Sequence, residues 1–299
     1  MQARRTLPFI AVQGSPVAWD PEATLAKLMA ETRQMYAYYP NTRLFLFPEY
    51  YLMGFHPPGT VPPDVRTAAQ LAEPIPGPTT SKLCDLAGEL GIWLVPGSAY
   101  ELGDDSELYN TAVAISPDGE IVAKYRKCFP WRPWEKTGAG KEFAVFDVEG
   151  VGRIGLMTCY DGWFPEVPRQ LAWLGAEVIL HPSATYTSDR AQELVLARAT
   201  AIVNQVYVVN VNSGGPAGAG LSIIVDPEGH PLQQSGTGEA YITEVLDFDA
   251  VRRVRQHGSV GLSRMWAQLD EEGMNLHLPM YGGSIHARDP SNVSEGLGR

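Results

Sequence analysis

The stretch Gly155-Leu156-Met157-Thr158-Cys159-Tyr160-Asp161-Gly162 places a single cysteine at the end of an apolar run. Val151 to Thr158 is typical of a buried strand, and Gly162 to Glu166 is typical of a turn that opens a helix. A thiol at such a corner leaves the sheet where backbone N–H groups converge, which is the placement that a nucleophile needs. Most unpaired cysteines are only small buried hydrophobic residues, so a catalytic role needs partners elsewhere in the chain.

Two other predicted strands also end in charged side chains. Arg43 to Tyr50 is an apolar run that ends in a carboxylate, Glu49. Lys124 to Glu135 leaves a strand and enters a loop rich in Pro and Trp, which carries Lys127 and a second acid at its end. A carboxylate, an ammonium and a thiol therefore follow one another along the chain, each at the end of a β-like run.

This order of residues resembles the nitrilase superfamily of carbon–nitrogen hydrolases, from near Leu7 to about Asp249. The resemblance implies that Glu49 is the general base, that Lys127 stabilises an oxyanion, and that Cys159 is the nucleophile. It also implies an α/β fold, a four-layer αββα sandwich with helices on the outer faces of two packed sheets. Protomers of this superfamily often associate through one helical face, so a homodimer or higher homo-oligomer is expected.

Finer patterns are similar to the aliphatic amidase and formamidase branch of that superfamily. They are Phe-Pro-Glu-Tyr around Glu49, Lys-x-x-Pro-Trp-x-Pro-x-Glu from Lys127 to Glu135, and Cys-Tyr-Asp-Gly-x-x-Pro-Glu from Cys159. The resemblance implies that Glu135 helps to hold the lysine and the substrate amide. It further implies hydrolysis of a non-peptide C–N bond in a small carboxamide to a carboxylic acid and ammonia, through a thioester on Cys159, with no metal and no organic cofactor.

Residues next to the predicted catalytic groups are candidates for substrate contacts. Tyr50 and Trp131 flank the site in sequence and are candidates to shape the acyl pocket, although aromatic residues at such places pack into the core equally often. The backbone N–H of Tyr160 is expected to share the oxyanion with the lysine. Asp161 is a candidate to lie near the leaving group, and capping of the following helix is an equally good interpretation.

The composition indicates one large globular domain, because 299 residues with 44% hydrophobic and 19% charged side chains suffice for a substantial core. A formal net charge of −11 argues against nucleic acid or an anionic membrane surface as the main partner, and favours a small-molecule substrate. The chain has three cysteines and nothing that resembles a disulfide framework. It also has no apolar run long enough for a membrane span, so the cytoplasm is the expected location.

Predicted strands and helices alternate along the chain, which is typical of an α/β architecture. Pro21–Tyr38 is predicted to be a helix, and Ile92–Tyr100 is predicted to be one strand. From about Gln256 the pattern loosens, so residues 1–256 are predicted to form the hydrolase domain. Residues 257–299 then form a C-terminal extension, for which packing on a neighbouring subunit and a frayed end are both open.

Other functions remain open at this point. Hydrolases of N-carbamoyl compounds, acyl hydrazides and nitriles in the same superfamily use the same three residues. A pairing of Cys159 with His181 would instead indicate a papain-like protease, and a degenerate fold would serve only as a scaffold. The sequence has no Gly-x-Ser-x-Gly elbow, no phosphate-binding loop and no His-Glu-x-x-His or Cys-x-x-Cys pair, which disfavours a serine hydrolase, a nucleotide-binding protein and a metal site.

Overall fold

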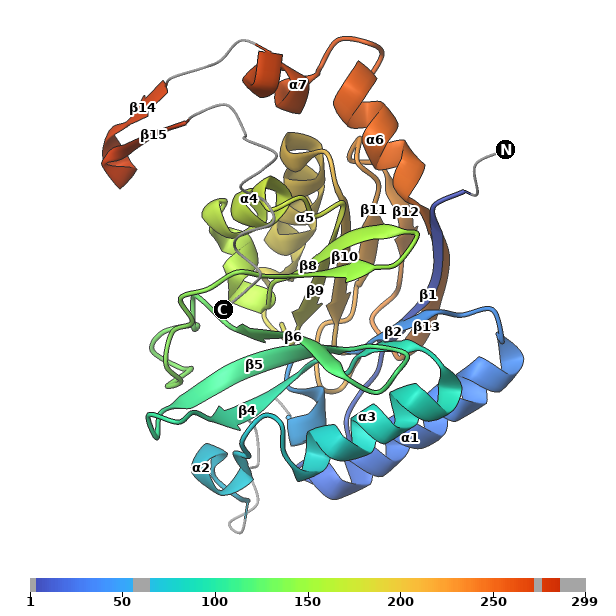
Figure 1. Cartoon of the computed structure of the whole chain (residues 1–299). Coiled ribbons are helices and arrows are strands. Elements are labelled where there is room, and N and C mark those ends of the chain that lie inside the picture. The colour runs from blue at the N-terminus through green and yellow to red at the C-terminus, as the bar shows by residue number, and fades with distance from the viewer. Residues whose placement is uncertain (1–3, 56–64, 272–275, 286–299) are drawn as a thin grey trace.

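Two β-sheets packed face to face form the centre of the molecule in the computed structural model, which describes residues 4–55, 65–271 and 276–285 (Figure 1). The first sheet has seven strands in the order β13-β1-β2-β3-β5-β4, with β6 paired to β5. In chain order these are β1 (Thr6–Gln13), β2 (Leu44–Leu46), β3 (Trp93–Val95), β4 (Ser98–Leu102), β5 (Leu108–Ile115), β6 (Ile121–Arg126) and β13 (Ala240–Asp247).

The second sheet has six strands in the order β12-β11-β10-β9-β8-β7. Its central strands β8, β9 and β10 run parallel, so their carboxyl ends meet at one edge of the sheet. The strands are β7 (Ala144–Val148), β8 (Gly152–Leu156), β9 (Val178–Ser183), β10 (Tyr207–Asn212), β11 (Ile223–Val225) and β12 (Pro231–Gln234).

Helices cover the outer face of each sheet. Leu28 of α1 and Leu83 of α3 share a buried cluster with Phe45 of the first sheet, whereas Leu171 of α4 and Ala201 of α5 belong to the cluster that includes the second sheet. The predicted four-layer αββα sandwich is therefore confirmed. The helices and 3₁₀ turns of this part are α1 (Pro21–Tyr38), η1 (Tyr51–Met53), α2 (Ala68–Leu71), α3 (Pro78–Leu90), η2 (Cys159–Trp163), α4 (Glu166–Trp173) and α5 (Arg190–Asn204).

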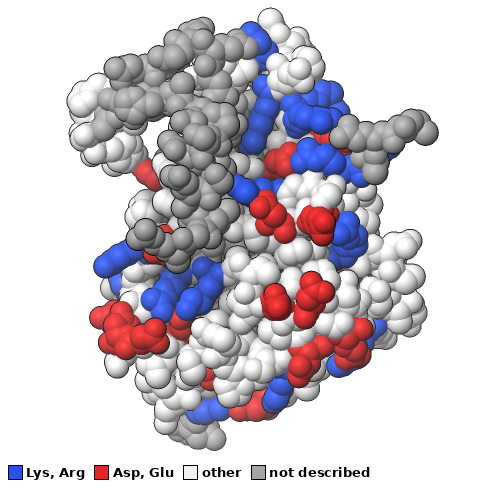
Figure 2. All heavy atoms as spheres, viewed as in Figure 1, with Lys and Arg blue, Asp and Glu red and all other residues white. Residues whose placement is uncertain are grey.

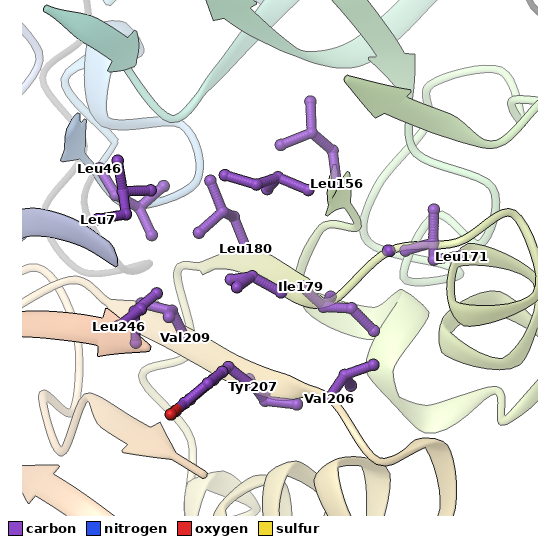
Figure 3. Close-up of a cluster of buried hydrophobic side chains, with 14 of the residues drawn as sticks. Leu7, Leu46, Leu156, Leu171, Ile179, Leu180, Val206, Tyr207, Val209 and Leu246 are labelled. Carbon is purple, nitrogen blue, oxygen red and sulfur yellow. The ribbon is translucent and has the colours of Figure 1, made fainter. Parts of the chain in front are cut away.

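The alternation of side chains along β1 explains how one strand serves two layers. Leu7 and Phe9 face the layer between the sheets, and Ile10 and Val12 face the helices α1 and α3. This period of two follows from the pleat of a strand. Figure 3 shows Leu7 from the first sheet and Leu180 from the second as members of the same buried cluster. Burial on both faces accounts for the nearly continuous apolar sequence of the strand.

The prediction of one strand over Ile92–Tyr100 is wrong, because the chain breaks into β3 and β4 at Gly97. This glycine has a φ of +84°, and a Cβ atom there would lie 1.8 Å from the carbonyl oxygen of Pro48. Only glycine allows so close an approach. The break therefore brings the chain beside the segment that carries Glu49, and Ser98 Oγ accepts a hydrogen bond from the N–H of Tyr50.

The end of the predicted hydrolase domain and the start of the C-terminal extension both pack against the rest of the chain. Helix α6 (Phe248–His257), which the sequence did not lead us to expect, buries Phe248 and Val251 in the cluster between the sheets. Trp266 is buried, and its indole N–H donates to the carbonyl of Asn204 at 2.7 Å. The extension continues with α7 (Met265–Glu271), β14 (Leu276–Leu278), η3 (Pro279–Tyr281) and β15 (Gly283–Ile285). Residues 272–275 and 286–299 lie outside the described residues, and packing on a neighbouring subunit stays a prediction.

The surface carries charges of both signs. On the face shown in Figure 2, basic and acidic side chains lie close to one another rather than in separate fields. Within the described part of the chain, no helix combines the length and the apolar character that crossing a membrane requires.

Candidate active site

Side chains from both sheets converge on one cavity of about 450 Å³. Glu49 follows β2, Lys127 follows β6 and Cys159 follows β8, and all three line this cavity. The Nζ atom of Lys127 lies 2.8 Å from Glu49 Oε1 and 2.7 Å from Oε2 of Glu135, which lines the cavity too. The acid, the ammonium and the sulfur, which are far apart in sequence, thus face one enclosed space.

Glu135 is held by several donors at once. Besides Lys127, its carboxylate accepts hydrogen bonds from Asn110 Nδ2 at 2.8 Å, from the hydroxyl of Tyr50 at 2.7 Å and from the N–H of Trp131 at 2.9 Å. Burial alone would raise its pKa, but the charge of Lys127 and these hydrogen bonds outweigh burial and leave the pKa of Glu135 below its usual value. Glu135 therefore stays ionised.

Glu49 differs from Glu135 in its pKa, although both acids accept hydrogen bonds from Lys127 and Asn110. Its Oε1 atom accepts from Lys127 and from Asn110 Nδ2, the latter at 2.8 Å. Burial raises the pKa of Glu49, the nearby charge of Glu135 raises it further, and Lys127 only partly opposes them. Two acids whose pKa values are pushed apart divide the work of a site, and the one with the raised pKa is the one that can accept a proton.

The remaining two groups keep their protons at rest. Burial would lower the pKa of Lys127, but the negative charges around it, with Glu49 and Glu135 in direct contact, dominate and raise it well above its usual value, so the side chain is an ammonium. Burial and the charge of Glu49 raise the pKa of Cys159 well above its usual value, so the sulfur is a thiol. Glu49 and Cys159 face the same cavity, and the Glu49 carboxylate acts electrostatically on the thiol, so Glu49 is placed to receive the thiol proton.

The backbone at Cys159 adopts the left-handed conformation, with a φ of +47°. This is uncommon for a residue other than glycine and is typical of constrained sites. Asn210 Nδ2 donates to His181 Nδ1 at 2.9 Å, so the Nε2 atom of that ring carries the proton and donates to the carbonyl of Cys159 at 2.8 Å. Burial lowers the pKa of His181 to about 4 and keeps it neutral. The imidazole thus contacts the backbone of the nucleophile and not its sulfur, unlike the arrangement in a Cys–His protease.

Gly162 makes room for that imidazole. A Cβ atom at this position would lie 2.6 Å from His181 Cε1, closer than real Cβ contacts allow. The turn after Cys159 therefore needs a glycine at position 162, so that His181 can reach the carbonyl of Cys159.

Asp161 ties the lysine loop to the cysteine turn. Its carboxylate is fully buried and accepts from the N–H of Phe129 at 2.8 Å, from the hydroxyl of Tyr125 at 2.7 Å and from the N–H of Thr158 at 3.0 Å. Burial raises its pKa to about 6. Asp161 does not border the cavity, so this geometry favours a positioning role over the contact with a leaving group that the sequence suggested.

The other predicted contact residues, Tyr50, Trp131 and Tyr160, all border the cavity. Tyr50 adopts a left-handed conformation with a φ of +51° and is anchored by its hydroxyl on Glu135. Their contact with substrate stays a prediction.

Sequence reasoning missed two polar groups at the site. Asn110 lies in β5 and bridges both carboxylates; a buried Asn inside an apolar strand was the available signal. Thr185 Oγ1 lies 3.9 Å from Cys159 Sγ and donates to Glu193 Oε1 at 2.8 Å, and Glu193 forms a buried ion pair with Arg190. The contacts of Thr185 and Glu193 depend on how the loop after β9 folds, and no local sequence pattern predicts that conformation.

Among the described residues, one group has the composition of a cation site. Asp226, Glu228 and His230 lie together in the turn between β11 and β12, outside the residues that line the cavity. Exposed acidic turns of this kind are common without an ion, and the cavity itself offers no such group among its described residues.

The sequence of this chain is similar to a family of carbon–nitrogen hydrolases and to named members of known activity. Residues 11–256 match the family model of carbon–nitrogen hydrolases. The human omega-amidase NIT2 is 34% identical over 203 residues, which cover 62% of this chain and 73% of the relative. A formamidase from Bacillus thuringiensis (strain Al Hakam) is 32% identical over 197 residues, which cover 66% of this chain and 58% of the formamidase.

A solved structure shares the overall fold. The amidase of Nesterenkonia sp. AN1, from the nitrilase superfamily, aligns with a TM-score of 0.70 at 25% identity, over 86% of this chain and 96% of that one. That structure is of a glutamate-to-glutamine mutant, and it shows covalent addition of the acetamide moiety of fluoroacetamide at the active-site cysteine.

Proposed function

The chain belongs to the carbon–nitrogen hydrolase family, and on this basis we propose that it hydrolyses small carboxamides to a carboxylic acid and ammonia through a thioester on Cys159. One observation carries the proposal. A buried ammonium, Lys127, bridges two carboxylates of opposite pKa shift in the wall of the cavity that also contains the thiol.

The first half of the reaction forms the thioester. Glu49 takes the proton of Cys159 as the sulfur attacks the amide carbon, since the raised pKa of the thiol leaves little free thiolate. The carbonyl oxygen gains negative charge, which the Lys127 ammonium and the N–H of Tyr160 stabilise. Loss of one such donor typically lowers kcat by about 10²- to 10³-fold. Glu49 then gives its proton to the nitrogen, the C–N bond breaks, and ammonia leaves.

The second half returns the enzyme to its resting state. Glu49 removes a proton from a water molecule as its oxygen attacks the thioester carbon, and Lys127 again faces the developing oxyanion. The C–S bond breaks, the sulfur takes the proton from Glu49, and the carboxylic acid departs. Glu135, which stays ionised, keeps Lys127 charged and in place throughout.

The covalent adduct on the active-site cysteine of the Nesterenkonia amidase supports a nucleophilic role for Cys159, and the names of the amidase relatives support amide hydrolysis. The test is to trap the acyl-enzyme. Acid quenching of the wild-type enzyme during turnover of a primary amide, followed by intact-protein mass spectrometry, should show the mass of one acyl group on Cys159, whereas Glu49→Gln, which lacks the base for the attack, should show none.

The matched controls are two cysteine variants. Cys159→Ser should release no ammonia and carry no acyl group, whereas Cys84→Ser, changed in a helix on the outer face of the first sheet, should behave as wild type. Ammonia release that survives Cys159→Ser would contradict the proposal. Parallel assays on a nitrile, an N-carbamoyl compound and an acyl hydrazide would show whether the same residues serve one of those reactions instead.

A further inference from the structure

Aromatic rings form a continuous surface along one side of the cavity. Tyr100 and Tyr50 lie 4.7 Å apart between ring centroids, Tyr50 and Phe55 lie 6.2 Å apart, Phe55 and Tyr186 lie 6.2 Å apart, and Tyr186 and Trp131 lie 6.5 Å apart. These distances are those of interacting aromatic pairs. All five residues line the cavity, and we call them the aromatic wall. Tyr50 and Phe55 flank η1, Tyr100 lies in β4, and Trp131 and Tyr186 lie in the loops that follow β6 and β9.

The space beside the aromatic wall exceeds what a formyl or acetyl amide needs. The cavity measures about 450 Å³, within the range of about 300–1,000 Å³ of sites that enclose drug-sized ligands. A second cavity of about 80 Å³ shares Trp19, Phe55, Ala68 and Tyr100 with the first and adds Pro21, Met53, Val65, Leu71 and Arg66. The guanidinium of Arg66 pairs with Glu22 at 2.6 Å. The site therefore continues past the aromatic wall into a small compartment with mostly apolar side chains and one cation that is already paired.

The charges around the cavity disfavour an anionic acyl group. The acid Glu193 is paired with Arg190 at 2.8 Å, and Asp189 accepts from Thr187. Among the described lining residues the cations are Lys127, which two carboxylates already engage, and Lys136, which is exposed to solvent. A substrate carboxylate deep in the cavity would face acids and the negative faces of aromatic rings.

Resting on the proposed amide hydrolysis, we infer that the natural substrate is an uncharged amide with a bulky apolar acyl group, such as one that carries an aromatic ring. The ring packs on the aromatic wall while the carboxamide reaches Cys159. Two members of the wall, Tyr50 through its hydroxyl and Trp131 through its backbone N–H, hydrogen-bond to Glu135, so a ring on the wall places the attached carboxamide at the catalytic groups. Because ammonia is the small product, the acyl side must fill this space.

The first experiment measures kcat/KM of the wild-type enzyme by ammonia release. The series is formamide, acetamide, hexanamide, phenylacetamide and 3-phenylpropanamide, with succinamic acid as the anionic partner of butyramide. Each buried methylene group strengthens binding about fourfold, and phenylacetamide should exceed acetamide by about 100-fold. Butyramide should exceed succinamic acid. A preference for formamide or acetamide, or for succinamic acid, would overturn the inference.

The second experiment asks whether the aromatic wall is responsible. Tyr186→Ala and Phe55→Ala should each lower kcat/KM for phenylacetamide about tenfold, mainly through KM, and change acetamide turnover less than about twofold. The control is Tyr38→Ala, because Tyr38 is 70% exposed on α1 and does not line the cavity. Circular dichroism checks folding. Equal losses for both substrates in folded variants would count against the wall.

The outcomes keep the two proposals apart. If every amide is inert in the wild-type enzyme and no acyl group appears on Cys159, the proposed function fails and this inference fails with it. If small amides are hydrolysed best through the acyl-enzyme, the proposed function stands and only the assignment of a bulky apolar substrate is lost.

Discussion

The two sheets supply the cavity with different kinds of chemical group. The first sheet contributes Glu49, Asn110 and Lys127, whose polar atoms are joined by hydrogen bonds of 2.8 Å. The second contributes Cys159 and His181, where the sulfur is placed through the backbone by a bond to its carbonyl. A hydrogen-bond network thus holds the charged groups of the first sheet in place, whereas the backbone conformation of Cys159 positions the nucleophile of the second sheet.

A residue with a left-handed backbone conformation occurs at the site in both sheets, after β2 in the first and after β8 in the second. Tyr50, directly after the acid, has a φ of +51° and leads into η1, and Cys159 has a φ of +47° and begins η2. What differs is the support. The network of the first sheet buries charges that need one another for stability, whereas the group that holds the carbonyl of Cys159 is the neutral imidazole of His181. Changes in the first sheet should therefore affect folding and catalysis together, and changes in the second should affect catalysis more selectively.

The largest expected effects come from removing the lysine of the first sheet or the cysteine of the second, and they test the difference between the two sheets most directly. Lys127→Met and Cys159→Ala should each lower kcat/KM by at least about 10⁴-fold, because each removes a group without which the reaction cannot proceed. Only Lys127→Met should also lower the free energy of unfolding, by about 3–5 kcal/mol, since two buried carboxylates lose their counter-charge. Urea unfolding measures this. Equal stability of the two variants would remove the distinction between the sheets.

A change in Asn110 tests how the network sets proton affinity. Asn110→Ala should lower kcat/KM about 100-fold, because each carboxylate loses a charge-assisted hydrogen bond. Loss of a donor disfavours the ionised form, so the pKa of Glu49 should rise and the acidic limb of the pH–rate profile should move to higher pH. The control is Asn41→Ala in an exposed turn. An unshifted acidic limb would assign that limb to another group.

Gly162 tests the support behind the cysteine. Gly162→Ala should lower kcat about tenfold, because the new Cβ displaces His181 from the carbonyl of Cys159. Gly236→Ala is the matched control, since a Cβ there meets nothing within 4 Å. Full activity of the Gly162 variant would mean that the carbonyl contact does not position the sulfur.

The smallest expected effect concerns stability and pH. Unfolded His181 takes up a proton near pH 6.5, but the folded protein resists this until about pH 4, so protonation favours the unfolded chain between these values. The free energy of unfolding should therefore gain about 2 kcal/mol from this residue as the pH rises from 4.5 to 6.5. Asp161, with a pKa raised to about 6, acts in the opposite direction. Comparison of wild type with His181→Gln isolates the histidine, and parallel stability curves would refute its role.

Local sequence patterns were sufficient for many of the helices and strands and for the charged ends of the strands. The helix Pro21–Tyr38 has its predicted bounds, because Asp20 accepts a hydrogen bond from the N–H of Ala23 and Pro21 follows at the first helical position. The carboxylate and the lysine were visible because charged residues directly follow buried runs.

Contacts between distant segments were out of reach of such patterns. The break at Gly97 depends on Pro48, nearly fifty positions away, and β12 is exposed along its whole length, so no apolar period marks it. Thr185 and Glu193 meet only once the loop after β9 has folded back on α5. The bridging role of Asn110 likewise depends on two acids from other segments.

The protonated state of Cys159 at rest also affects how long the enzyme survives. Peroxide and other electrophiles react with the thiolate, so cysteines of low pKa are the ones that are oxidised first. Here the sulfur becomes strongly nucleophilic only when a base withdraws its proton during turnover. The enzyme should therefore keep an unoxidised Cys159 under oxidative stress that inactivates enzymes whose resting cysteine is a thiolate. The burial and the Glu49 charge that protect the sulfur at rest belong to the same site that activates it during turnover.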